Sequence, residues 1–178
     1  LEQSIKVARV IYDKGGGECS AEQLAGWLDY SSTRNGTYLT RFYAAKHFGL
    51  INASRGVINV TDRARAILAP VMPEDSVNAK AEAFLNIPLF AKVYEQFKGK
   101  SLPPEVGLKN LFHGTYKVPS HRATQALRMF RNSATQAGFF SINSDRLISP
   151  AGTTHSERKP IVVSKDEAQP QSEKQVRV

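Results

Sequence analysis

The strongest constraint on the fold is an order of elements that the chain uses twice. In each half, the sequence predicts an amphipathic helix, a second short helix, a polar turn, and a third helix that ends in a glycine and two large apolar residues. These ends read Phe48-Gly49-Leu50-Ile51 and Ala137-Gly138-Phe139-Phe140. A glycine there can adopt the left-handed conformation that ends a helix. The repetition predicts two similar small domains within the 178 residues.

Helix start and stop signals define the beginning of the first half. Apolar residues at three- and four-residue spacing predict a helix over residues 4–14, which three glycines at 15–17 end. Ser20 and Gln23 form a capping-box pattern that predicts the start of the second helix. The turn-forming run at residues 31–36 then leads into the third helix.

The third helix of the first half is predicted over residues 37–48. Tyr38, Phe42 and Ala45 recur at core spacing and leave a polar face outward. A helix face of this kind fits the major groove of DNA, where Thr, Asn and Arg can bond base edges or phosphates. We expect nucleic-acid contacts from Asn35, Thr37, Thr40 and Arg41.

Two short apolar stretches after Gly49 predict a β-hairpin. Residues 52–56 form its loop and Val57 begins the second strand. Arg55 near the tip is expected to reach a phosphate or a narrow minor groove. Thr61 is predicted to cap a short closing helix over residues 62–68.

A polar, proline-containing passage at residues 71–84 is predicted as a linker whose end enters a helix. Beyond it, apolar spacing predicts a first helix that Gly99 ends and a second that begins near Pro103-Pro104 and ends at Gly114. The third helix is predicted over residues 120–137.

The third helix of the second half is predicted to have a buried apolar stripe and polar residues at most other positions. Ala123, Leu127 and Phe130 begin the stripe. Arg and Gln at the polar positions suit bidentate contacts with guanine and adenine. The alternative is that this polar face is simply solvated. The expected contact residues in this half are Lys117, His121, Arg122, Gln125, Arg128 and Asn132.

This order of elements is typical of a winged helix-turn-helix domain. The predicted fold class is mainly α with small β-hairpin wings. The predicted boundaries are winged-helix domains at 1–70 and 85–150, a linker or helical connector at 71–84, and a disordered tail at 151–178, where polar and charged residues dominate.

The second half also resembles a family of bacterial and archaeal domains of unknown function. The similar stretches are Leu108-Lys109-Asn110-Leu111-Phe112, the serine-started helix Ser120-His121-Arg122-Ala123-Thr124-Gln125-Ala126, and the strand start Phe139-Phe140. The first half is similar to generic prokaryotic winged helices in its run at residues 31–38 and in Gly49-Leu50-Ile51. Together the resemblances cover residues 4–148 and imply a fold, with no characterised reaction.

Composition narrows the function classes. The formal net charge is +8 and the pI is near 9.7, which favours polyanionic partners. Residues 81–150 hold nine basic and four acidic side chains, whereas residues 1–80 hold ten and eight. The single cysteine, Cys19, excludes an intrachain disulfide and multi-thiolate zinc sites. Because no phosphate-binding glycine loop or nucleophile–base pair is evident, we expect no enzyme, cofactor or metal.

The sequence therefore predicts a prokaryotic, cytoplasmic and nucleoid-associated protein that binds double-stranded DNA, with its third helices in successive major-groove segments. Transcriptional regulation or an accessory DNA-binding role would fit, and no membrane association is expected. The alternative is a winged-helix protein–protein interaction module in a chromosome-associated or other complex. Single-stranded nucleic acid or RNA is a third option, and a homodimer is left open.

Overall fold

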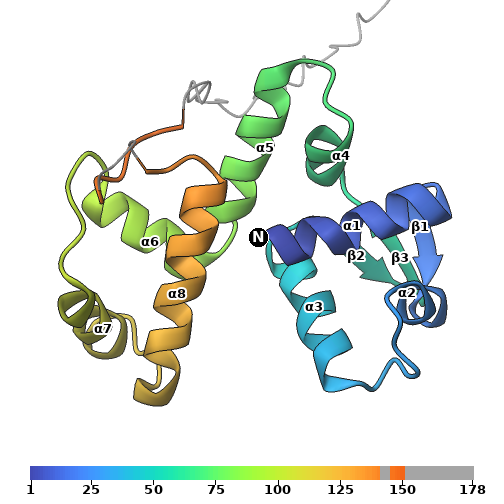
Figure 1. The fold of residues 1–178 in the computed structure, drawn as a ribbon, viewed down its shortest axis with the longest axis horizontal. Helices are drawn as coiled ribbons and strands as arrows, with labels where there is room; N and C mark the ends of the chain where they lie inside the picture. The colour runs from blue at the N-terminus through green and yellow to red at the C-terminus, as the bar shows by residue number, and fades with distance from the viewer. Residues whose placement is uncertain (141–144, 151–178) are drawn as a thin grey trace, which may run out of the picture.

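A computed structural model describes residues 1–140 and 145–150 of the chain (Figure 1). The described part is mainly helical with one small antiparallel sheet, so the coarse fold class is confirmed. The tail predicted at residues 151–178 lies outside the described residues, and so do Asn143 and Ser144 of the turn Asn143-Ser144-Asp145 that is predicted for the second wing. In chain order the elements are α1 (Glu2–Gly15), β1 (Glu18–Ser20), α2 (Ala21–Trp27), α3 (Gly36–His47), β2 (Ile51–Ser54), β3 (Val57–Val60), α4 (Asp62–Leu68), α5 (Pro73–Leu85), α6 (Pro88–Phe97), α7 (Glu105–Gly114) and α8 (Ser120–Gln136).

The predicted caps of the first half are confirmed. Ser20 Oγ accepts a hydrogen bond from the Gln23 amide at 3.2 Å, and Gln23 Oε1 accepts one from the Ser20 amide at 2.9 Å. Thr61 Oγ1 accepts from the Ala64 amide at the start of α4. Each such cap stabilises a helix by about 1 kcal/mol because it satisfies amides that have no partner within the helix.

The three strands of the first half pair in the order β1-β3-β2, with both ladders antiparallel. Ile58 in the central strand lies opposite both Cys19 of β1 and Ala53 of β2. β1 was not predicted. The β2–β3 turn is also tighter than expected, because Arg55 and Gly56 alone connect the strands, with φ angles of 51° and 82°.

The second half repeats the connections of the first. Ser101 pairs with Arg146 and Phe140 pairs with Leu147, in positions that correspond to the β1–β3 and β2–β3 pairs. The third helices also end alike. The amide of Leu50 donates to the carbonyl of Ala45 at 3.0 Å, and the amide of Phe139 donates to that of Ala134 at 2.9 Å. Gly49 and Gly138 precede these residues with φ angles of 68° and 77°.

Most of the segment expected as a linker is the helix α5, and this helix carries core residues. Ala79, Ala81, Ala83 and Phe84 are buried on it. The Phe84 ring centroid lies 5.2, 5.5 and 4.6 Å from those of Phe90, Phe130 and Phe139. Phe84 therefore brings α5 into the second half's core, while α5 also packs against α4 of the first half.

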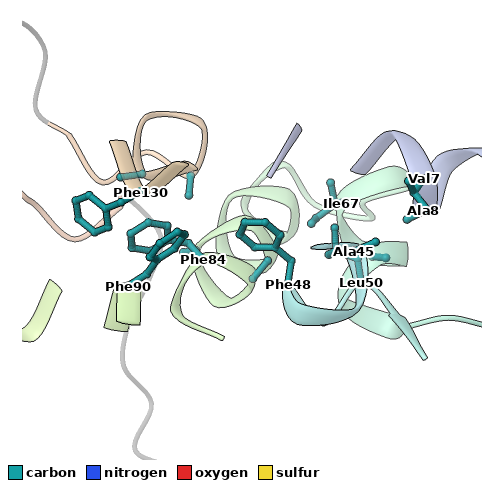
Figure 2. Packing of buried hydrophobic residues seen from close by; sticks show 14 of the residues in the cluster. Val7, Ala8, Ala45, Phe48, Leu50, Ile67, Phe84, Phe90 and Phe130 are labelled. Atoms are coloured by element: carbon teal, nitrogen blue, oxygen red, sulfur yellow. The ribbon is translucent and has the colours of Figure 1, made fainter. Parts of the chain in front are cut away.

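The buried residues form one cluster that runs through both halves. Figure 2 shows Phe48 lying between Leu50 and Ala45 of the first half and Phe84 and Phe90 of the second. Polar contacts also cross this junction between the halves. Asn86 Nδ2 donates to the His47 carbonyl at 2.8 Å. Arg63 Nε pairs with Glu82 of α5 at 3.5 Å, and Arg63 Nη1 donates to the Phe48 carbonyl within the first half at 3.4 Å. These contacts set the position of α3 relative to α6 and α8.

Candidate nucleic-acid interface

Asn35 is the N-cap of α3. Its Oδ1 accepts hydrogen bonds from the amides of Thr37 at 2.9 Å and Tyr38 at 3.2 Å. Asn35 was expected to contact nucleic acid, and this capping role was not predicted. The cap holds Tyr38 in the core and leaves the Thr37 side chain exposed at the first turn of the helix.

Intramolecular contacts restrict the side chains of Arg41 and Thr40. The guanidinium carbon of Arg41 lies 5.7 Å from the centroid of the Tyr30 ring, and the side chain is half-buried. A cation over an aromatic face is stabilised by the ring's quadrupole. Thr40 is exposed, and its Oγ1 donates to the Gly36 carbonyl at 2.8 Å. Arg41 is thus held in place beside the turn that precedes α3.

The five residues predicted on α8 are all exposed, and the predicted stripe of this helix is buried. Helical spacing divides them between two sides of α8. One side carries His121, Gln125, Arg128 and Asn132, at successive offsets of four, three and four residues. Arg122 lies on the other side, four residues before Ala126, which faces the first half.

The two third helices, α3 and α8, are alike in carrying no negatively charged side chain. The segment 115–136 contains four lysine or arginine residues and no acidic residue, and α3 contains no acidic residue either. Arg131 Nη1, on α8, donates a hydrogen bond to Asp145 Oδ1 at 2.9 Å, so the positive charge of Arg131 is partly compensated. Exposed positive charge without neighbouring carboxylates favours polyanionic partners.

Two of the predicted basic residues have a left-handed backbone. Arg55 at the β2–β3 turn has a φ angle of 51°, and Lys117 before α8 has a φ angle of 58°. Both side chains are exposed. Non-glycine residues adopt this conformation at a cost, and such positions are enriched at functional sites.

The first turns of α3 and α8 point toward the same side of the molecule, at the bottom of Figure 1. The turns that precede both helices, with Arg34 in one and Lys117 in the other, lie at that side too. The structure therefore brings Thr37, His121 and Arg122 to one side of the fold, each in the first turn of its helix.

Above these ends, the outward face of α3 and one face of α8 border a common groove of about 400 Å³. Thr40, Tyr43 and His47 contribute from α3, and Ala126 and Met129 from α8. Part of the face expected to read DNA is thus turned toward the second half. Sequence spacing gave no signal for this groove, because it depends on how the halves are placed.

Burial raises the pKa of the Cys19 thiol to about 11, so this side chain is a poor nucleophile at neutral pH. Within residues 1–140 and 145–150, no group of three or more His, Cys, Asp or Glu residues is arranged to hold a metal ion. No helix in the same part of the chain is long and apolar enough to cross a membrane.

Comparisons of this chain with known protein families, with curated proteins and with solved structures found no match.

Proposed function

We propose that this protein binds double-stranded DNA through two tandem winged-helix domains. The observation that supports this most strongly is the repetition: each half has the order helix, strand position, helix, helix and a strand pair, and each third helix lacks acidic residues. This order is that of a winged helix, in which the third helix is the recognition helix. The excess of basic side chains in the second half gives α8 the larger share of the attraction.

Recognition helices of this class contact bases with their N-terminal residues. The first turns of α3 and α8 lie on one side of the molecule, which makes this side the proposed DNA-facing surface (Figure 1). On it, His121, Arg122 and Gln125 of α8 are placed for base contacts. Lys117, Arg128 and Arg55 would supply phosphate contacts.

The relative position of the two helices narrows this proposal. Successive major-groove segments repeat about every 34 Å along a duplex. α3 and α8 border a single groove of about 400 Å³, so they lie much closer together than that. We therefore favour α8 as the helix that enters a major groove, with Arg41 and the β2–β3 turn of the first half on the neighbouring backbone.

A fluorescence-anisotropy titration of a random duplex of about 30 base pairs tests this assignment. We expect wild-type affinity to fall steeply between 50 and 200 mM salt, as it does for proteins that neutralise several phosphates. The Arg122→Ala/Arg128→Ala variant should bind much more weakly. The Arg9→Ala/Lys14→Ala variant removes the same charge from exposed positions on α1 and should bind nearly as wild type. No binding at low salt would refute the proposal.

The second candidate is a protein-interaction module. Tyr43 and Met129 favour it, because they are 51% and 44% exposed at the edge of an apolar groove. Large exposed apolar side chains that cluster are typical of interaction sites. Absence of duplex binding together with a complex that is stable at high salt would favour this function over the first.

A further inference from the structure

The groove between α3 and α8 has the size of a small-molecule site. Its volume of about 400 Å³ lies within the range of about 300–1,000 Å³ that is usual for ligand pockets. The N-terminal part of α6 contributes Leu89 and Phe90 to its lining, and Ile87, the N-cap of α6, lines it too. Pockets at the junction of two domains are a common place for ligands, because two surfaces can enclose them.

The walls of this groove are mainly aromatic and aliphatic. Tyr43, Phe48 and Phe90 supply aromatic rings, and α8 supplies the Met129 thioether. Thioethers pack favourably against aromatic rings. The polar side chains at the groove, Thr40, Tyr43 and His47, all come from α3. An aromatic ring system therefore fits the walls.

The side chains that line the groove carry no negative charge. None of the lining residues is acidic, and neither α3 nor α8 contains a carboxylate. Arg122 shares a face of α8 with Ala126 and Met129, at offsets of four and seven residues, and Lys46 adjoins His47 on α3. This surrounding charge is complementary to an anion.

The negative end of the α3 dipole is also compensated near the groove. The carbonyls of His47 and Phe48 accept hydrogen bonds from Asn86 and Arg63. Carbonyl groups at the end of a helix would otherwise disfavour an anion there. Their engagement reduces this unfavourable contribution, while Arg63 itself also pairs with Glu82 at 3.5 Å.

We propose that this groove binds a small aromatic molecule that carries a single negative charge, such as an aromatic carboxylate or sulfonate. The rings pack between Tyr43, Phe90 and Met129, and the anionic group lies toward Arg122. A consequence, which rests on the proposed function, is that the ligand competes with DNA for Arg122 and weakens DNA binding.

Two fluorescent probes with the same ring system test the site directly in the full chain. 1-Anilinonaphthalene-8-sulfonate is an aromatic anion, and N-phenyl-1-naphthylamine is its uncharged counterpart. We expect one equivalent of the sulfonate to bind, about tenfold more tightly than the neutral probe, which corresponds to about 1.4 kcal/mol. Arg122→Gln should abolish this preference and leave binding of the neutral probe unchanged. Equal affinities for the two probes, or several equivalent sulfonate sites, would overturn the proposal.

Filling the groove provides a second test. Ala126→Phe should abolish binding of both probes, whereas Thr124→Phe, at an exposed position of α8 outside the groove, should not. Far-UV circular dichroism checks that each variant is folded. Ala44→Phe fills the same groove from α3 and replaces Ala126→Phe if that variant is unfolded. Probe binding that survives in a folded groove-filling variant would contradict the site.

The regulatory consequence has its own readout, a gel-shift titration of duplex DNA with and without the sulfonate. We expect saturating sulfonate to weaken DNA binding, and DNA to weaken sulfonate binding by the same factor. Sulfonate binding at one site with unchanged DNA affinity would refute only the regulation. A chain that binds the sulfonate and never binds DNA would refute the proposed function and leave the site intact.

Discussion

The ring centroids of Phe48 and Phe90 lie 6.4 Å apart, and this contact joins the core of the first half to that of the second. Phe48 follows α3, and Phe90 lies in the first turn of α6. Phe90 is 3% exposed and also contacts Phe84 and Phe130, at 5.2 and 5.5 Å between centroids. The halves are therefore expected to unfold as one cooperative unit, although each repeats the same connections.

Phe90→Ala tests this coupling. Removing a buried phenylalanine usually costs about 3–5 kcal/mol, because burial is lost and a cavity remains. Trp27 is the only tryptophan and lies in the first half, so its fluorescence reports that half alone. We expect the urea midpoint of Trp27 fluorescence to fall together with that of far-UV circular dichroism. Val106→Ala, at a 69% exposed position, should change neither midpoint. An unchanged Trp27 transition in Phe90→Ala would show that the halves are independent.

Asn35 allows capping to be separated from DNA contact. Asn35→Ala removes the acceptor for the Thr37 and Tyr38 amides and should lower the free energy of unfolding by about 1 kcal/mol. Asn35→Ser keeps an N-cap oxygen and should retain most of that stability. We expect Asn35→Ser to bind duplex DNA as wild type does. A large loss of affinity in a stably folded Asn35→Ser protein would assign the amide to DNA contact instead.

Arg55 is expected to lower the stability of the fold and to raise the affinity for duplex DNA. Its φ angle of 51° suits asparagine better than arginine, and Asn-Gly is the preferred pair for a turn of this type. Arg55→Asn should therefore raise the free energy of unfolding by about 0.5–1 kcal/mol and weaken duplex binding. The control Arg9→Asn, within the exposed face of α1, should be slightly destabilising and leave DNA affinity nearly unchanged. If Arg55→Asn is more stable and binds DNA equally well, Arg55 has no role in binding.

The Cys19 thiol predicts a pH dependence in the alkaline range. Its folded-state pKa is raised by burial from 9.0 to about 11, so the folded state holds the proton more tightly than the unfolded state does. The stabilising contribution is complete below pH 9 and is lost as pH rises toward about 11. We expect urea unfolding between pH 8 and 10.5 to show a shallower loss of stability in Cys19→Ala than in wild type. Identical slopes for the two proteins would contradict a raised pKa.

The sequence predicted those elements whose signals are local. The Ser20–Gln23 capping box, the Thr61 cap and the glycine that ends α3 each depend on residues within a few positions of one another. The buried stripe of α8 was predicted for the same reason, because helical spacing alone determines which residues share a face.

The features that were missed depend on partners distant in the sequence. β1 is only three residues long, and it is a strand because it pairs with β3 about forty residues later. The proline and polar residues at the start of α5 obscured the buried alanines that follow, whose environment is supplied by other elements. The position of Thr40 at the groove required the placement of the second half against α3.

The most direct test of DNA binding by α8 is the slope of log affinity against log salt concentration for a duplex of about 30 base pairs. Each phosphate contact that is lost should reduce the magnitude of this slope by about 0.9. Lys117→Gln/Arg128→Gln should therefore reduce it by about 1.8, and Arg9→Gln/Lys14→Gln on α1 should leave it unchanged. Equal slopes for wild type and both variants, or no measurable binding by wild type at low salt, would contradict the account.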